Sequence, residues 1–308
     1  MAPSCHAHAV VVTSHARQIS SYVFVSPSVN LTGSETFPIF MNLISRFPKA
    51  ARLALLVPRF RSGFSYIAPN FKLLLTWLLR SREYTNFTYD LQSINEDYLA
   101  SLISLVTSAP YEEVSRYLLE VKSDEGLKKH ISVRTAESSF LAISDEFARY
   151  GRRVGWYAFV RATKPKVVVE TGIDKGLGGC VICRALQRNQ EEGYPGMYYG
   201  TDINPEAGWL IGDMIIGKIL YGDSIESLRK LDKIDLFIND SDHSAKYEAR
   251  EYETIAAKLS PQGIILGDNA HVTNQLQIFS LAHGRRFLFW AEKPAKHWYP
   301  GAGIGVSY

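Results

Sequence analysis

The feature that most constrains the fold is a regular alternation, over residues 166–308, of short apolar runs with stretches of helical periodicity. Such alternation is typical of a mostly parallel sheet that is covered by helices on both faces. The apolar runs predict seven strands, over residues 167–169, 197–201, 218–221, 234–238, 263–266, 286–290 and 304–307. We expect the last two strands to pair antiparallel, because no helix is predicted between them. The predicted fold class is therefore α/β, with a doubly wound, seven-stranded, mostly parallel sheet and an antiparallel last strand.

Helices are predicted between the strands and through the middle of the chain. Their ranges are 94–107, 110–122, 137–163, 177–190, 246–259 and roughly 272–283. Residues 41–82 are expected to form only short helical pieces. The reason is that Pro48, Pro58 and Pro69 interrupt this stretch, and proline breaks or kinks helices.

The chain is predicted to have three parts: a basic, partly disordered or short-helical extension (1–82), a helical cap region (83–163) and a domain built on the sheet (164–308). The extension holds nine Lys or Arg residues and a single acid, Glu35, so its formal charge is +8. Because the whole chain carries +3, the remainder carries −5. This balance argues against nucleic acid as a partner, since phosphate binding needs concentrated positive charge. The basic extension could contact an anionic surface or partner, or it could be solvated.

Neither a membrane span nor a secretory signal is predicted. The longest strongly apolar stretch, 73–79, is too short to cross a bilayer. Residues 1–40 lack the ordered basic region, apolar region and cleavage site of a signal peptide. We therefore expect a cytoplasmic protein.

An acidic side chain follows each of the first five predicted strands. These acids are Glu170, Asp202, Asp223, Asp240 and Asp268. Ligands of open parallel sheets bind beyond the carboxyl ends of the strands. One acid in such a position commonly caps a helix, but five of them at one edge of a sheet indicate a shared ligand site.

The loop after the first strand begins with Glu170, Thr171 and Gly172 and continues to Gly176. Its glycines allow a tight turn and a close approach of the backbone to a ligand. The spacing differs from G-x-G-x-x-G, which disfavours a dinucleotide. The acid at the strand end suits a cationic ligand group better than a pyrophosphate.

The next two strand ends add groups that suit a nucleoside. Asp202 is placed to accept hydrogen bonds from ribose hydroxyls, Asp223 can accept from an exocyclic amine, and Ser224 adds a hydroxyl. A ligand with an amino group, a ribose and an adenine in this order is S-adenosylmethionine. The predicted cofactor-binding residues are Glu170, Thr171, Gly172, Gly176, Asp202, Asp223, Ser224 and Asp240.

The segment 166–308 resembles the class I S-adenosylmethionine-dependent methyltransferases, in particular the group of macrolide-sugar O-methyltransferases and cephalosporin-hydroxylase-like proteins. Val168-Val-Glu-Thr-Gly172 is similar to the first motif of the family. Phe237-Ile-Asn-Asp-Ser-Asp-His243 is similar to the second signature of this group. The resemblance implies that 164–308 is a methyltransferase domain that binds S-adenosylmethionine.

The resemblance also implies a metal site. In the metal-dependent O-methyltransferases, one Asp after the fourth strand and an Asp-Asn pair after the fifth hold a divalent cation. The matching residues in this chain are Asp240, Asp268 and Asn269. Oxygen ligands suit Mg²⁺, although an Asp-Asn pair can also simply close a turn.

Two histidines are candidates for proton transfer. His243 is the first candidate general base, because an ordinary histidine pKa of about 6.5 suits proton removal near neutral pH. Asp242 could orient His243 or contact a metal ligand, and His271 is the second candidate base.

Two further motifs are predicted to be structural. Cys180 and Cys183 have C-x-x-C spacing, but they lie among apolar residues of a predicted helix and have no second cysteine pair, so we expect them to be buried by packing. Arg152 and Arg153 are expected on a solvated face; the alternative is a contact with an acidic acceptor.

These observations predict a methyltransferase that, assisted by a divalent cation, methylates a hydroxyl of a small molecule in secondary metabolism. Two alternatives stay open: a metal-free N- or C-methyltransferase, and an inactive nucleotide-binding or interaction protein of the same fold. The expected partners are a small-molecule acceptor and a second copy of the chain, bound through the N-terminal helical region.

Overall fold

The computed structural model describes residues 52–53, 55–147 and 149–308. The contacts between Cα atoms divide the chain into two compact units, residues 1–64 and 65–308. The predictions for residues 1–51, including an interruption at Pro48, lie outside the described residues. The three-part division of the chain stays a prediction.

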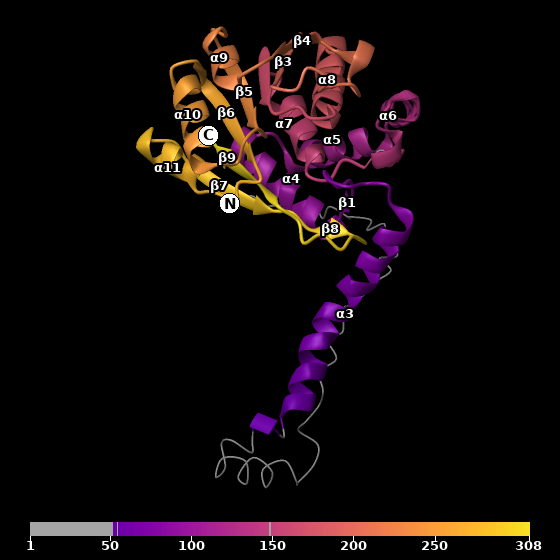
Figure 1. The fold of residues 1–308 in the computed structure, drawn as a ribbon. Coiled ribbons are helices and arrows are strands. Elements are labelled where there is room, and N and C mark those ends of the chain that lie inside the picture. Colours follow the sequence, from indigo (N-terminus) through magenta and orange to yellow (C-terminus); the bar gives the residue numbers. More distant parts are fainter. Residues whose placement is uncertain (1–51, 54, 148) are drawn as a thin grey trace, which may run out of the picture. The chain divides into compact units, whose positions relative to one another are not determined.

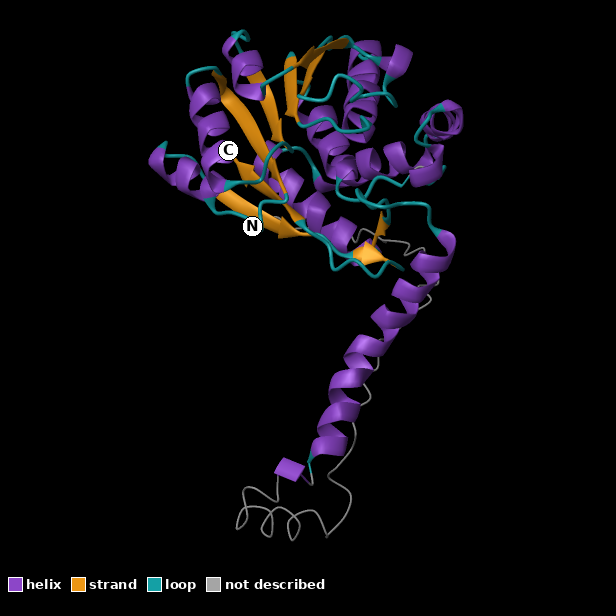
Figure 2. Ribbon diagram, viewed as in Figure 1, coloured by secondary structure: helices purple, strands orange, loops and turns teal. Residues whose placement is uncertain are grey.

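The larger unit contains a seven-stranded sheet with the strand order β4-β3-β2-β5-β6-β9-β7 (Figures 1 and 2). Its strands are β2 (Val167–Thr171), β3 (Met197–Asp202), β4 (Gly217–Tyr221), β5 (Ile234–Asn239), β6 (Leu259–Asp268), β7 (Phe287–Ala291) and β9 (Gly303–Ser307). The neighbours from β4 to β6 pair in parallel, whereas β9 pairs antiparallel with both β6 and β7. The predicted fold class is confirmed, including the antiparallel last strand.

Helices cover both faces of this sheet (Figure 1). One face carries α8 (Leu177–Glu191) and α7 (Arg153–Thr163), with α4 (Ser93–Thr107), α5 (Tyr111–Ser123) and α6 (Glu125–Glu137) packed around them. The other face carries α9 (Ser224–Arg229), α10 (Ala245–Ala256) and α11 (Gln275–Ala282). Two apolar cores result, one with Trp156 and Phe159 among its members and the other with Tyr252 and Phe279. Burial of both sheet faces explains the nearly continuous apolar runs of the central strands.

The register of the parallel strands brings their carboxyl ends to one edge of the sheet. Thr171 at the end of β2 pairs with Thr201 on β3 and with Asn239 on β5. Asn239 in turn pairs with Gly267 on β6. The acids that follow these strands are therefore collected along one edge, as the sequence predicts.

The single helix predicted over 137–163 is wrong. In the structure α6 ends at Glu137, a 3-10 turn covers Leu141–Ile143 (η2), and α7 begins only at Arg153. Gly151 has a φ of +51° and donates its N–H to the carbonyl of Tyr89, so the backbone at this point leaves the helical conformation. Tyr89 precedes β1 (Asp90–Leu91), which pairs antiparallel with β8 (Pro294–Ala295) in a second, two-stranded sheet.

The expectation that Pro58 and Pro69 leave only short helical pieces is also wrong. Helix α3 runs without a break from Leu56 to Arg80 and contains Pro69. Pro58 lies in the first turn, where the backbone N–H has no partner within the helix and its loss costs little. Pro69 removes one hydrogen bond from a helix of 25 residues, and the helix continues through seven residues, 73–79, that are mostly Leu.

Two smaller predictions can be compared directly with the described residues. Cys180 and Cys183 are buried in α8, as expected for packing. Among the described helices, none combines the length and the apolar character that crossing a bilayer requires.

Candidate active site at the carboxyl ends of the strands

A cavity of about 480 Å³ lies at the carboxyl ends of β2, β3 and β5 and beside the loop that follows β4. We call it the strand-end cavity. Its lining includes six of the residues predicted to form the site: Gly172, Asp202, Asp223, Ser224, Asp240 and Asp242. The structure therefore brings together groups that lie up to 70 residues apart in the sequence.

Two glycines set the shape of the loop after β2. Gly172 has a φ of +77°, and a Cβ atom at this position would lie 2.0 Å from the carbonyl oxygen of Asp240. Gly176 has a φ of +95° and caps α8, and a Cβ atom there would lie 2.8 Å from Cγ1 of Ile211. A side chain at either position would collide with these atoms, so both positions require glycine for the loop to keep this path.

Asp202 at the end of β3 holds the neighbouring backbone in place. One carboxylate oxygen accepts a hydrogen bond from the N–H of Asp174 at 2.9 Å, and the other accepts from the N–H of Asn204 at 2.8 Å. The residue remains partly exposed in the cavity. Each carboxylate oxygen can accept a second hydrogen bond, so Asp202 keeps the capacity to bind a hydroxyl donor.

The residues after β4 form a polar corner of the cavity. Asp223 caps the N-terminus of α9 by accepting from the N–H of Glu226 at 3.1 Å. Tyr247 on α10, which sequence reasoning missed, donates its hydroxyl to Asp223 at 3.4 Å and lies 2.9 Å from the hydroxyl of Ser224. The corner thus presents a carboxylate and two hydroxyl groups.

A buried carboxylate on α10, Glu251, joins the strand ends beneath the cavity. It accepts hydrogen bonds from the side chains of Ser224, Asn239, Ser241 at 2.6 Å and Thr171 at 3.5 Å. Burial raises the pKa of Glu251, and hydrogen bonds from its four partners oppose that rise. Thr171 is therefore bound to α10 and does not line the cavity, contrary to its predicted role in cofactor binding.

The sequence of α10 contains a pattern that indicates the buried role of Glu251. Glu248, Glu251, Tyr252 and Ile255 are the buried residues of α10 and recur at spacings of three, one and three residues. Such spacing defines one helical face. Two acids on an otherwise apolar face require polar partners in the core, so they mark this helix as part of a site.

Glu170 lies apart from the other predicted cofactor residues. Its carboxylate points toward the helices, where it accepts a hydrogen bond from the hydroxyl of Tyr198 at 2.6 Å and packs against Gly178. It is buried and does not line the strand-end cavity. Burial raises its pKa to about 8. The expectation that Glu170, Asp202 and Asp223 line one crevice therefore holds for the two aspartates alone.

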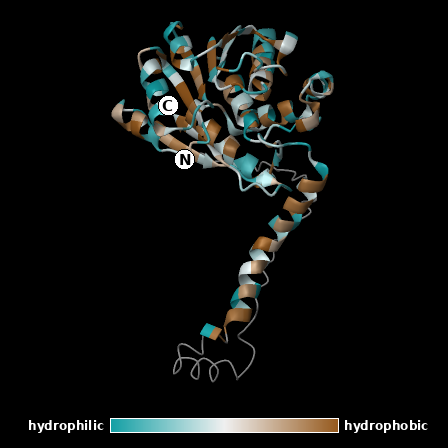
Figure 3. Cartoon of the chain, viewed as in Figure 1, coloured by the Kyte–Doolittle hydropathy of each residue, from teal (hydrophilic) through white to brown (hydrophobic). Residues whose placement is uncertain are grey.

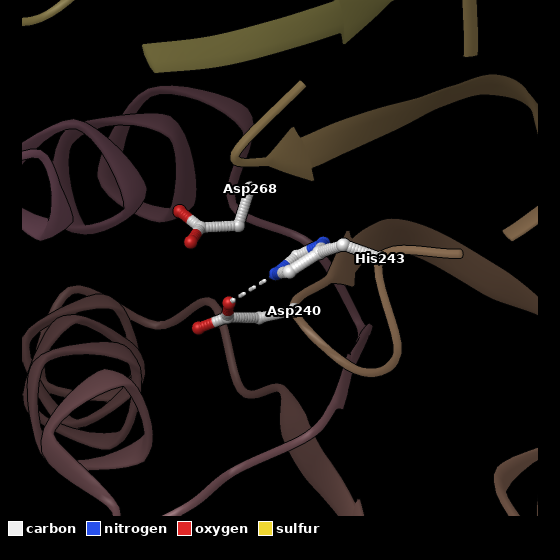
Figure 4. Close-up of side chains that lie close together, drawn as sticks. All are labelled: Asp240, His243 and Asp268. Carbon is white, nitrogen blue, oxygen red and sulfur yellow. Dashed lines mark ion pairs between the residues drawn. The ribbon is translucent and has the colours of Figure 1, made fainter. Parts of the chain in front are cut away.

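Next to the cavity, three side chains form a compact group (Figure 4), which we call the Asp–His–Asp cluster: Asp240, His243 and Asp268. One ligand atom of each lies within 4.8 Å of those of the others. Nε2 of His243 lies 3.6 Å from Asp240 and 3.1 Å from the amide nitrogen of Asn269, and Nδ1 lies 3.3 Å from Glu248. The predicted metal-site residues and the first candidate base are thus neighbours in space.

Mutual proximity changes the acidity of this cluster. Burial and the neighbouring Asp268 raise the pKa of Asp240 to about 7. Burial opposes the charge on His243, but its contacts with Asp240 and Glu248 outweigh burial and raise its pKa to about 10. His243 therefore carries a proton at neutral pH in this arrangement, and it can act as a base only if its pKa is lowered.

Arg152 and Arg153 also contact the cluster. The prediction that they lie on a solvated face is wrong. Arg152 is buried, forms two hydrogen bonds with the carboxylate of Asp268 and lies 3.1 Å from Glu292. Burial opposes ionisation of Asp268, but Arg152 outweighs it and lowers the pKa of that carboxyl. Arg153 lies 3.7 Å from Asp240. Both arginines lie at the start of α7. Arg152 precedes its partner Asp268 by 116 residues in the sequence.

The two remaining catalytic candidates lie outside the cluster. Asp242 accepts hydrogen bonds from the N–H and the hydroxyl of Ser244, at 2.9 and 3.1 Å, just before α10. It therefore holds the turn before α10 and lines the cavity, but it makes no hydrogen bond with His243 among the described residues. His271 is exposed in the turn after β6. Their predicted catalytic roles stay predictions.

The cluster fits a divalent cation in the type and spacing of its donors. Asp240 and Asp268, two of the predicted ligands, each offer a carboxylate oxygen within 4.8 Å of the other, and burial together with Asp268 raises the pKa of Asp240. The third predicted ligand, Asn269, lies beside them through its contact with His243. Arg152 already binds both oxygens of Asp268, so a cation must share that carboxylate with the guanidinium.

Comparison with known proteins supports the assignment of the domain. Residues 169–270 match the family model of a methyltransferase domain. No curated protein matches the sequence. The matched residues extend from β2 to just beyond β6 and so include all the residues that line the strand-end cavity.

Several solved structures resemble this chain at low identity. A SAH-bound methyltransferase of Podospora anserina is 14% identical, with a TM-score of 0.43 over 72% of this chain and 98% of the other. An O-methyltransferase of Bacillus cereus in complex with SAH is 14% identical, with a TM-score of 0.43 over 60% and 91%. The O-methyltransferase TomG of Streptomyces achromogenes, involved in tomaymycin synthesis, is 13% identical, with a TM-score of 0.42 over 60% and 89%.

Residues 169–270 match a methyltransferase domain, and the order and directions of the sheet strands are those of the predicted α/β fold. The resemblance of residues 166–308 to the class I S-adenosylmethionine-dependent methyltransferases is thereby confirmed.

Proposed function

We propose that this protein transfers the methyl group of S-adenosylmethionine to a hydroxyl of a small molecule in secondary metabolism, assisted by a divalent cation. One observation carries the proposal. Asp240 belongs both to the lining of the strand-end cavity and to the Asp–His–Asp cluster. A cofactor in the cavity and an acceptor at the cluster would therefore meet at this residue.

The cavity offers partners for each polar part of the cofactor. Asp202 keeps free acceptor capacity for ribose hydroxyls, and the corner of Asp223, Ser224 and Tyr247 suits an adenine amine. Gly172 lets the backbone approach the ligand closely. In this arrangement the enzyme gains rate mainly by aligning the sulfonium methyl with the acceptor oxygen.

The cluster supplies the means to remove a proton from the acceptor. A divalent cation held by Asp240, Asp268 and Asn269 would supply positive charge that stabilises the acceptor oxygen as an anion and lowers the pKa of His243. Among the chain's own residues, Glu248 holds Nδ1 of His243, which leaves Nε2 as the atom that would take up the acceptor proton. Arg152 keeps Asp268 ionised and oriented.

A specific observation supports the alternative of metal-free methylation. Arg152 and Arg153 already place two positive charges against Asp268 and Asp240. In that case the cluster is a closed set of ion pairs that orients the acceptor, and the acceptor could be a nitrogen or a carbon. The alternative of an inactive protein requires that the strand-end cavity binds no S-adenosylmethionine.

Binding and turnover experiments separate these functions. Calorimetry with S-adenosylmethionine tests the cavity: Asp202→Asn should weaken binding about 10- to 100-fold, because hydrogen bonds to a charged acceptor stabilise by ~1.5–3 kcal/mol. The matched control is Asp213→Asn, a side chain that is 92% exposed. No binding by the wild type would support an inactive protein.

The cation is tested separately, by electron paramagnetic resonance of Mn²⁺ and by methyl transfer from labelled S-adenosylmethionine to a panel of phenolic and sugar hydroxyls. Asp268→Asn should weaken Mn²⁺ binding and abolish transfer, yet leave the cofactor Kd nearly unchanged, because Asp268 does not line the cavity. Transfer that is insensitive to a chelator would support the metal-free alternative.

A further inference from the structure

Helix α3 (Leu56–Arg80) has an unusual surface. It carries four cations, Arg59, Arg61, Lys72 and Arg80, and not one acidic residue over its 25 positions. Brown, hydrophobic residues recur along it in Figure 3. Many of its large apolar side chains are exposed, which is not the state expected of an ordinary packed helix.

The apolar side chains of its second half follow a helical period. Ile67, Phe71, Leu75 and Leu78 recur at steps of four, four and three residues, so they form one stripe along the helix. We call them the α3 stripe. Their exposed fractions are 62%, 53%, 45% and 58%. The stripe is therefore an amphipathic face that lacks a partner among the described residues.

A different side of the same helix packs on the methyltransferase domain. The ring of Trp77 lies 5.4 Å from that of Phe87 and 5.3 Å from that of Trp298, measured between centroids. Ser81, just after the helix, donates a hydrogen bond to Asp145 at 2.8 Å. The end of α3 is thus anchored through Trp77, and Leu78 beside it stays exposed.

We propose that α3 binds the surface of an anionic lipid bilayer and so places the methyltransferase domain next to a membrane. Helices that lie in the plane of a membrane combine Phe, Leu and Trp on one face with Lys and Arg on the polar face and at its borders. The α3 helix has this composition: Lys72 follows Phe71 and Arg80 follows Leu79, and no acid opposes negative lipid headgroups. The inference goes beyond methyl transfer and does not depend on it.

Charge decides between a lipid surface and a second copy of the chain. A dimer formed through two stripes would leave the four cations of each helix without a partner of opposite charge, because neither helix has an acid. An anionic surface gains about fivefold in affinity for each Lys or Arg near it. No described helix can cross a bilayer, so α3 would lie on the membrane surface.

The test is sedimentation of the full chain with vesicles. Vesicles of phosphatidylcholine with 30% phosphatidylserine are compared with pure phosphatidylcholine, at low salt and at 0.5 M NaCl. We expect binding to the anionic vesicles to exceed binding to the neutral ones at least fivefold and to weaken in high salt. Phe71→Ser with Leu78→Ser should reduce binding more than tenfold, because two apolar side chains no longer insert.

A matched pair of charge reversals isolates the helix. Lys72→Glu should weaken binding to anionic vesicles, whereas Arg229→Glu on α9, an exposed residue with the same change in net charge, should weaken it much less. Unchanged far-ultraviolet circular dichroism shows that the variants are folded.

Three outcomes would overturn the proposal. They are equal binding to neutral and anionic vesicles, no binding to either, and equal effects of Lys72→Glu and Arg229→Glu. Light scattering adds a fourth: a dimer in the absence of lipid that the double serine variant converts to a monomer would assign the stripe to a second copy.

Discussion

The buried carboxylate of Glu251 provides the sharpest test of how this site is held together. One side chain on α10 accepts hydrogen bonds from groups at the ends of β2 and β5 and at the start of α9. Replacing it by glutamine keeps the size and shape of the side chain. It also replaces one acceptor oxygen by an NH₂ donor and removes the negative charge that the four partners face.

The expected magnitude follows from the number of partners. Hydrogen bonds to a charged acceptor stabilise by ~1.5–3 kcal/mol each, and neutral ones by ~0.5–1.5 kcal/mol. Three of the four partners donate to the oxygen Oε2, and the fourth, Ser224, can reverse its hydroxyl. Burial of the charge offsets part of the gain, as the raised pKa of Glu251 shows. We therefore expect Glu251→Gln to lower the free energy of unfolding by about 2 kcal/mol.

The measurement is urea denaturation, together with calorimetric titration of S-adenosylmethionine. The Kd for the cofactor should rise about tenfold, because the hydrogen bonds that hold Ser224 and Ser241 in the cavity lining become weaker without the charge. The control is Glu253→Gln, the same chemical change on the same helix at a side chain that is 65% exposed. A surface change of this kind should alter stability by less than about 0.5 kcal/mol.

The reasoning fails if Glu251→Gln and Glu253→Gln have the same stability. It also fails if Glu251→Gln destabilises the fold but leaves cofactor affinity unchanged. In that case Glu251 would hold α10 to the sheet without shaping the cavity.

Three further predictions follow from buried charges. The pKa of Glu170 in the folded protein is about 8 against an ordinary 4.5, so this group should lower the free energy of unfolding between pH 4.5 and about 8 by up to ~1.4 kcal/mol per pH unit. Asp240, whose pKa is about 7, adds a slope of the same sign below that pH, so Glu170→Gln should make the slope shallower by its own share, and a slope equal to that of the wild type would refute the raised pKa of Glu170. Arg152→Met leaves Asp268 buried without its partner and should cost about 3–5 kcal/mol in urea denaturation; a loss below about 1 kcal/mol would contradict a buried ion pair. Glu248→Gln removes a carboxylate that raises the pKa of His243, so nuclear magnetic resonance titration should give a lower pKa for His243 in the variant than in the wild type, and equal values would refute the contact.

Much of the fold could be predicted from the sequence because it depends on local periodicity. Seven apolar runs at the right spacing predicted the strands, and their alternation with helices predicted the parallel sheet. The break before α7 could not be predicted, because Gly151 leaves the helix through a hydrogen bond with Tyr89, 62 residues earlier. The helix through Pro69 was missed for a different reason. Proline removes one hydrogen bond, but helix formation is cooperative, and the other residues of this 25-residue helix offset that loss.

The candidate site also has features that the sequence predicts and features that only tertiary packing sets. Parallel strands end at one edge of a sheet, so the sequence by itself determined that Asp202, Asp223 and Asp240 would gather there. Only the tertiary structure decided which way each side chain points and what charge stands opposite it. Glu170 turns toward Tyr198 and away from the cavity, and Arg152 reaches Asp268 across 116 residues. The cause is physical: a strand end follows from the pattern of its own neighbours, whereas a buried charge is satisfied by whichever distant group the packing of the helices brings within hydrogen-bonding reach.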